Sequence, residues 1–138
     1  MYPPGISCRV EGKWMENSER KDRGIELLQR MIGEEEAECV RERWKKICPD
    51  FEQYIVEFVS GDVWSRPGLD LRTKSLVTIA VLASQGRTLG LELNIRMAVN
   101  NGATKEEIVE TLLQIGPYTG FATVWEALAM ADDVFAKM

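Results

Sequence analysis

The sequence contains no histidine among its 138 residues, so it lacks the side chain that most readily transfers protons near neutral pH. Cysteine is scarce as well: Cys8, Cys39 and Cys48 are the only three, and no two form a Cys-x-x-Cys pair. With no histidine and such scattered cysteines, we expect no transition-metal site. Three unpaired cysteines are typical of reduced thiols, so we expect a cytoplasmic protein.

Long apolar runs and an excess of positive charge are also missing. No run approaches the roughly 20 apolar residues that span a bilayer, and no basic segment followed by an apolar one marks a signal peptide. Seventeen Lys and Arg against twenty-two Asp and Glu give a net charge of -5. These features argue against membrane and nucleic-acid partners, because phosphate binding requires clustered basic residues. The remaining composition, 45% hydrophobic and 28% charged, is that of a globular chain.

The first 16 residues show no hydrophobic periodicity and contain Pro3, Pro4, Gly5 and Gly12. Such residues interrupt regular structure, so we expect residues 1–16 to form an extended or disordered arm. Its Val10 and Trp14 are candidates to dock on a neighbour. Residues 17–138 are then expected to form one domain.

The rest of the chain predicts helices separated by clear breaks, and no strand pattern competes with them. Ser18 is expected to cap a first helix that ends at Gly33. A second helix is expected from the acidic residues 34–36 to Pro49. Asp50 and Gln53 resemble a capping box that starts a third helix running through Val59, followed by a loop over residues 61–69.

The most apolar part of the sequence predicts an antiparallel helical hairpin over residues 70–85 and 88–100. The first of these helices has little polar surface, which indicates burial on nearly all sides. Thr104 and Glu107 form the capping box of a sixth helix. A last helix over residues 120–135 is expected to turn Val124, Leu128, Ala131 and Phe135 inward. So apolar a middle in a small chain favours a homo-oligomer.

Several segments of this chain, taken in order, resemble the carboxymuconolactone decarboxylase family. They are GDVWSRPGL at 61–69, LRTKSLVTIA at 71–80, AVNNG at 98–102 and YTGF at 118–121. The resemblance implies an all-α, alkylhydroperoxidase-D-like helical array around a central antiparallel helical hairpin. It also implies a homo-oligomer, a hexamer or trimer, with pockets near subunit boundaries.

The sequence departs from the functional pattern of that superfamily. Peroxidase-type members carry a glutamate, a Cys-x-x-Cys pair and a histidine where this chain has Ser75, Arg87, Gly90 and Asn94. A disulfide-cycling peroxidase is thereby excluded at this position. Decarboxylase members usually keep the histidine, which suits protonation of the carbanion left when carbon dioxide departs. Asn94 can form hydrogen bonds there but cannot titrate.

Seven residues are candidates for the site. Arg72 is expected to grip a substrate carboxylate or enolate, or else to form a surface ion pair. Asn94, Ser75 and Tyr118 are candidates to hydrogen-bond a developing enolate, and the tyrosine phenol is also a possible proton donor or core cap. The substrate-binding candidates are Trp64, Arg66 and Trp125, with core packing as the alternative for Trp125.

Two functions follow from these observations. The first is a cofactor-independent lyase that acts on a small carboxylated or enolisable cyclic metabolite, by decarboxylation or by a changed reaction such as dehydration, isomerisation or cyclisation. The alternative is a non-catalytic binding or scaffolding oligomer that keeps the helical assembly without the catalytic groups. A polar-lined pocket favours the first, and a pocket closed by packed side chains favours the second.

Overall fold

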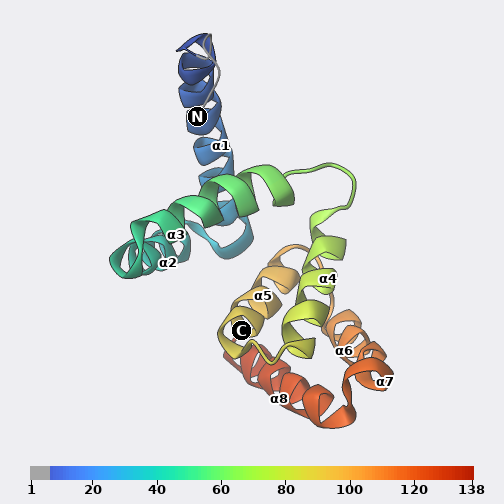
Figure 1. Ribbon diagram of the computed structural model, residues 1–138. Coiled ribbons are helices and arrows are strands. Elements are labelled where there is room, and N and C mark those ends of the chain that lie inside the picture. Colours follow the sequence, from blue (N-terminus) through green and yellow to red (C-terminus); the bar gives the residue numbers. More distant parts are fainter. Residues whose placement is uncertain (1–6) are drawn as a thin grey trace. The chain divides into compact units, whose positions relative to one another are not determined.

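The computed structural model describes the backbone of residues 7–138 and the side chains of residues 19–138. All regular structure in this part of the chain is helical, which confirms the predicted all-α class. The chain forms two compact units, the first ending at Arg66 and the second running from Pro67 to Met138 (Figure 1).

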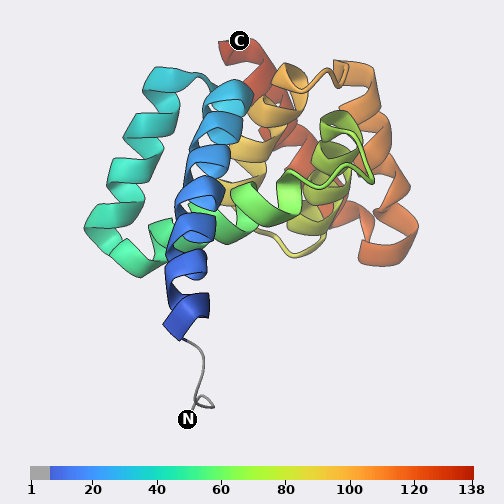
Figure 2. The same ribbon diagram turned by 90° about the horizontal axis from the view of Figure 1, so that it is seen from above.

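The first unit contains α1 (Ser7–Ile32), α2 (Glu34–Ile47), the short α3 (Pro49–Gln53) and the π-helix η1 (Tyr54–Trp64). Both views show α1 crossing η1 (Figures 1 and 2). Glycine allows this crossing, because a Cβ on Gly24 would collide with the Val56 carbonyl oxygen and one on Gly61 with the Arg20 carbonyl oxygen. The side chain of Arg23 adds a hydrogen bond from Nε to the Gly61 carbonyl oxygen at 2.6 Å.

Three predictions for this unit are wrong. The backbone of residues 7–16 is helical rather than extended, because adding residues to an existing helix costs little free energy. Residues 1–6 and the side chains of Val10 and Trp14 lie outside the described part of the chain. The third helix begins at Pro49 with Cys48 at its N-cap, instead of at the predicted capping box of Asp50. Residues 61–64 continue η1, because packing on α1 stabilises helix where turn residues predicted a loop.

The second unit contains five helices: α4 (Leu71–Ser84), α5 (Thr88–Asn100), α6 (Lys105–Gln114), α7 (Gly116–Thr119) and α8 (Phe121–Lys137). The predicted antiparallel hairpin is confirmed as α4 and α5, which lie side by side (Figure 1). The core of the unit is aliphatic, and it contains Ile79, Ala83, Leu91, Ile95, Ala98, Ile108, Leu112, Ala127, Ala131 and Val134.

Local signals set the ends of these helices, close to the bounds that the sequence predicted. The Asp70 carboxylate accepts a hydrogen bond from the Thr73 amide at 2.7 Å and caps α4. At the end of α5, Gly102 takes the left-handed conformation with φ of 98°. Thr104 and Glu107 form both hydrogen bonds of the predicted capping box at the start of α6. Each boundary depends on hydrogen bonds within a few residues, which explains why sequence patterns located them.

The predicted burial of the fourth helix on nearly all sides is not met within one chain. The buried residues of α4 are Ser75, Ile79 and Ala83, whereas Val77 and Val81 are 52% and 48% exposed. The last helix matches its prediction more closely, with Val124 and Ala131 buried and Leu128 and Phe135 partly buried. None of the helices in the described residues is long and apolar enough to cross a membrane.

Candidate functional site

A polar cluster lies where the start of α4, the end of α5 and the start of α6 meet. We call it the Arg72 cluster, and its members are Arg72, Ser75, Asn101, Thr104 and Glu107. Two of the predicted site residues, Arg72 and Ser75, stand three positions apart on α4 and therefore share a helix face. The structure brings these two into one cluster.

Arg72 and Glu107 form a two-pronged ion pair. The Arg72 Nε donates to Glu107 Oε2 at 2.9 Å, and Arg72 Nη2 donates to Oε1. Both side chains are partly exposed, at 43% and 31%, so water still reaches the pair. The predicted alternative for Arg72, an ion pair, is thus what the single chain contains.

Glu107 serves the α6 cap and the ion pair together. Its Oε2 also accepts from the Thr104 amide at 3.0 Å, and its own amide donates to Thr104 Oγ1 at 3.0 Å. The Arg72 hydrogen bond, followed by that of the Thr104 backbone, lowers the pKa of Glu107 to about 2. In turn, the hydrogen bond to Glu107 raises the pKa of Arg72, so both groups are ionised at neutral pH.

Ser75 is fully buried on the same helix as Arg72. Its hydroxyl oxygen accepts a hydrogen bond from Asn101 Nδ2 at 2.9 Å, which ties α4 to the end of α5. In the sequence, Asn101 stood out only as part of the AVNNG segment. Its link to Ser75 was missed because the partners lie 26 residues apart, beyond the range of any capping pattern.

Asn94 is partly buried on α5, and its side chain turns back onto its own helix. The amide Nδ2 donates to the Gly90 carbonyl oxygen at 2.8 Å. This bond occupies one donor and leaves the Oδ1 acceptor out of that contact. Asn94 therefore has hydrogen-bonding capacity beyond the helix.

Two aromatic candidates are exposed rather than packed. Tyr118 on α7 is 83% exposed and Trp125 on α8 is 75% exposed, with Phe121 beside them in sequence at 64%. The alternatives of core capping for Tyr118 and core packing for Trp125 are therefore wrong. Phe121 was not among the predicted site residues, although it belongs to the YTGF segment, which was a signal that could have drawn attention to it.

Trp64 and Arg66 belong to the first unit. Trp64 is the last residue of η1 and is partly buried, and Arg66 follows it as an exposed residue. The Arg66 amide donates to the Val63 carbonyl oxygen at 3.3 Å and closes the turn after η1. Their role as substrate contacts remains a prediction.

A family model described as "Carboxymuconolactone decarboxylase family" matches residues 49–133, from the start of α3 into α8. The chain belongs to the carboxymuconolactone decarboxylase family. This membership confirms the resemblance predicted from the ordered motifs.

Individual relatives of this carboxymuconolactone decarboxylase family member cover most of its length. It is 39% identical over 124 residues to 4-carboxymuconolactone decarboxylase of Acinetobacter baylyi, covering 90% of this chain and 92% of that protein. It is 32% identical over 117 residues to nitrosuccinic acid decarboxylase npaB of Metarhizium robertsii, and the match covers 85% of this chain and 82% of that protein. A third relative, an uncharacterized 15.0 kDa protein of Paracoccus denitrificans, is 34% identical over 95 residues, and the match covers 67% of this chain and 71% of that protein.

Proposed function

We propose that this protein is a cofactor-independent lyase that acts on a small carboxylated or enolisable cyclic metabolite in the cytoplasm. The observation that carries the proposal is its similarity, over most of its length, to two proteins named as decarboxylases. The names of these relatives give different substrates, so loss of carbon dioxide is the chemistry that they share. Without histidine, a changed reaction such as dehydration, isomerisation or cyclisation is the second form of this proposal.

Decarboxylation breaks the bond to the carboxyl carbon and leaves an electron pair on the neighbouring carbon of the substrate. The reaction requires hydrogen-bond donors where this negative charge develops, and then a proton. Arg72 is suited to hold the substrate anion, because Glu107 engages Nε and Nη2 while the guanidinium has further N–H groups. Asn94 is proposed to hydrogen-bond the enolate that forms.

The proton is proposed to come from the Tyr118 phenol or from water. Glu107 is unsuited to donate it, since a carboxyl group with a pKa of about 2 carries no proton at neutral pH. Ser75 is fully buried and bonded to Asn101, which favours a positioning role on α4 over direct contact with substrate. Trp64 and Arg66 on the first unit and Trp125 on the second remain proposed substrate contacts.

The test is turnover of a panel of carboxylated lactones and nitro-substituted acids, followed by carbon dioxide release and by mass spectrometry of the products. We expect turnover of at least one class, and a loss of kcat/KM when Arg72 is replaced by Gln. An Arg72→Gln Glu107→Gln double variant controls for the unpaired carboxylate that the single change leaves. If the folded protein converts no member of the panel, the lyase proposal is wrong.

A non-catalytic binding or scaffolding oligomer is the second candidate. Two observations favour it: the chain has no histidine, and the side chain at position 94 is bonded to its own helix backbone. This candidate predicts saturable binding of a panel compound with no chemical change. The same mass-spectrometric assay separates the two candidates.

A further inference from the structure

The contact between Arg72 and Glu107 fixes one edge of the guanidinium and leaves its outer edge open. Glu107 accepts from Nε at 2.9 Å and from Nη2, and these are two of the five N–H groups of the side chain. Among residues 19–138, the Arg72 side chain forms no other hydrogen bond, and it is 43% exposed. One N–H of Nη1 and the second N–H of Nη2 therefore form a fork, the outer fork, that is directed away from Glu107.

Glu107 is itself held in place, which allows it to restrain Arg72. Its Oε2 accepts from the Thr104 amide at 3.0 Å, and its own amide donates to Thr104 Oγ1 at 3.0 Å. This capping box ties the carboxylate to the backbone at the start of α6. The orientation of the guanidinium is therefore set by α6, although Arg72 belongs to α4.

The turn of α4 that carries Arg72 is fixed as well. Ser75 is fully buried three positions later, and its hydroxyl accepts from Asn101 Nδ2 at 2.9 Å. The Asp70 carboxylate caps the same turn by accepting from the Thr73 amide at 2.7 Å. Both the backbone and the tip of Arg72 are thus restrained.

We propose that Glu107 is a positioning residue for substrate binding: it fixes Arg72 so that the outer fork meets two oxygen atoms of the substrate. The inference rests on the proposed function, in which Arg72 holds the substrate. The ion pair as a whole is neutral, so recognition depends on directed N–H donors and not on an excess of positive charge. A long side chain that is already ordered loses less conformational entropy when the substrate binds.

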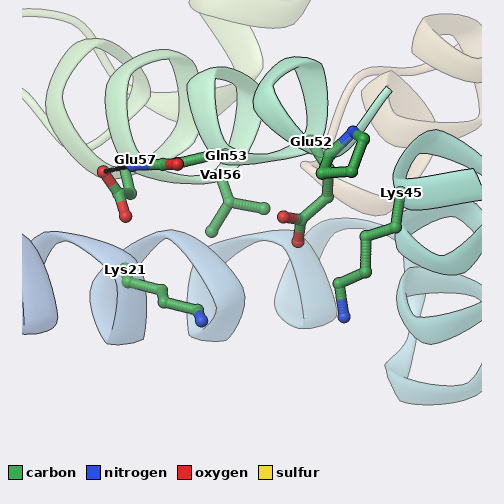
Figure 3. A pocket seen from close by; sticks show the side chains of 7 residues that line it. Lys21, Lys45, Glu52, Gln53, Val56 and Glu57 are labelled. Atoms are coloured by element: carbon green, nitrogen blue, oxygen red, sulfur yellow. Dashed lines mark hydrogen bonds between the residues drawn. The ribbon is translucent and has the colours of Figure 1, made fainter. Parts of the chain in front are cut away.

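A hollow in the first unit offers no comparable open donor (Figure 3). Its volume is about 300 Å³, and its lining sets two lysines against two glutamates. Glu52 is already bonded to Arg41 at 2.9 Å and Lys45 to Glu42 at 3.0 Å. The charges of this hollow are compensated within the protein, whereas the outer fork of Arg72 is open. The residues that line the hollow are Lys21, Lys45, Pro49, Glu52, Gln53, Val56 and Glu57.

Glu107→Gln separates positioning from simple masking of charge. Glutamine keeps the shape and an oxygen that can accept from the Thr104 amide, but it cannot accept both Arg72 bonds as a carboxylate does. If Glu107 positions Arg72, KM for a converted panel compound rises about three- to tenfold, while kcat stays within about twofold. If Glu107 only masks the charge of Arg72, its removal lowers KM for an anionic substrate, and the proposal is overturned.

Glu106→Gln is the matched control, because it removes the same charge from the preceding residue, which is exposed and does not bond to Arg72. Its KM is expected to match that of the unmodified protein. In an Arg72→Gln background, Glu107→Gln should raise KM no further, since its effect passes through Arg72. A further rise in that background, or an equal rise in Glu106→Gln, contradicts the proposal.

Nuclear magnetic resonance of isotope-labelled arginine side chains gives a readout that does not require turnover, and Arg72→Gln identifies the Arg72 signals. We expect separate Nη signals in the unmodified protein and averaged signals in Glu107→Gln, because loss of the carboxylate frees rotation of the guanidinium. Averaged signals in the unmodified protein overturn this inference and leave the lyase proposal standing.

Failure of the lyase proposal has a different signature, in which no panel compound is converted. Dissociation constants of the panel compounds then replace KM in the same comparison of variants. If no compound binds in a way that depends on Arg72, the positioning role of Glu107 is wrong as well.

Discussion

At the scale of single residues, Glu107 connects local structure to a long-range contact. One carboxylate completes the capping box of α6 with Thr104 and also pairs with Arg72, which lies 35 residues earlier. Both interactions favour the ionised form, and together they lower the pKa of Glu107 to about 2. The stability of the second unit should therefore depend on acid through this residue.

We expect a defined pH range for that dependence. A carboxyl group whose pKa falls from 4.5 to about 2 on folding contributes stability that is fully present above about pH 4.5 and is lost as the pH falls toward 2. In Glu107→Gln this contribution is absent, so thermal unfolding midpoints should fall less steeply between these pH values. Calorimetric scans across the acid range measure the difference.

Glu110→Gln is the matched control, because Glu110 lies on the same helix and is exposed. Its acid profile should follow that of the unmodified protein. Equal acid slopes for Glu107→Gln and the unmodified chain would show that the pair with Arg72 does not stabilise the fold.

Asn94 carries the second prediction at this scale. If its side chain donates to a developing enolate, Asn94→Ala should slow turnover by roughly 10²–10³, as loss of one such donor typically does. Asn94→His should add a titrating group and produce a bell-shaped pH profile of kcat/KM. Steady-state kinetics on a substrate found by the panel measure both effects.

Asn100→Ala is a suitable control, since this exposed residue ends the same helix. It should leave kcat/KM within a few-fold of the unmodified value. A pH profile of Asn94→His that matches the unmodified enzyme would place position 94 outside the reaction.

At the scale of elements, the crossing of α1 and η1 depends on two small residues. The backbone of α1 approaches η1 so closely at Gly24 that a Cβ there has no room beside the Val56 carbonyl oxygen. Arg20 and Arg23 flank the crossing, and Arg20 Nη2 pairs with Asp62 at 2.6 Å. A single methyl group should therefore force these two helices apart.

Gly24→Ala is expected to destabilise the first unit by at least about 1–3 kcal/mol, the usual effect of overpacking a tight contact. Chemical denaturation followed by circular dichroism measures this loss. Gly68→Ala is the control, because a Cβ at Gly68 meets no atom within 4 Å. If both variants unfold at the same denaturant concentration, the close approach of the helices is not a requirement of the fold.

At the scale of the whole molecule, the exposed apolar side chains of the second unit favour self-association. They include Val77 and Val81 on α4, Leu89 on α5, and Phe121 and Trp125 on α8. Large apolar patches on a soluble chain usually mark contact surfaces. We therefore retain the proposal of a homo-oligomer, a hexamer or trimer.

Sedimentation velocity at micromolar concentration should give a species of several chains. Val77→Glu combined with Val81→Glu should lower the sedimentation coefficient, since it places charge on the exposed face of α4. Gln114→Glu, an exposed change on α6, should leave the coefficient unchanged. A stable monomer of the unmodified protein would contradict the proposal.

The sequence by itself determined the helical class, the hairpin of α4 and α5, the capping box of Thr104 and Glu107 and the family. These features follow from hydrophobic spacing and from hydrogen bonds between residues a few positions apart, and both can be recognised in the sequence alone. That Asn94 stands where relatives carry a histidine stays a prediction. The sequence failed at the start of α1 and at the end of η1, where extension from an existing helix and packing outweighed turn-forming residues.

Only the tertiary structure decided which polar residues meet. It paired Arg72 with Glu107 and joined Ser75 to Asn101. It also left Tyr118 and Trp125 exposed in the single chain. The physical reason is that these arrangements depend on how helices distant in sequence pack, and packing is set by the shapes of many side chains together.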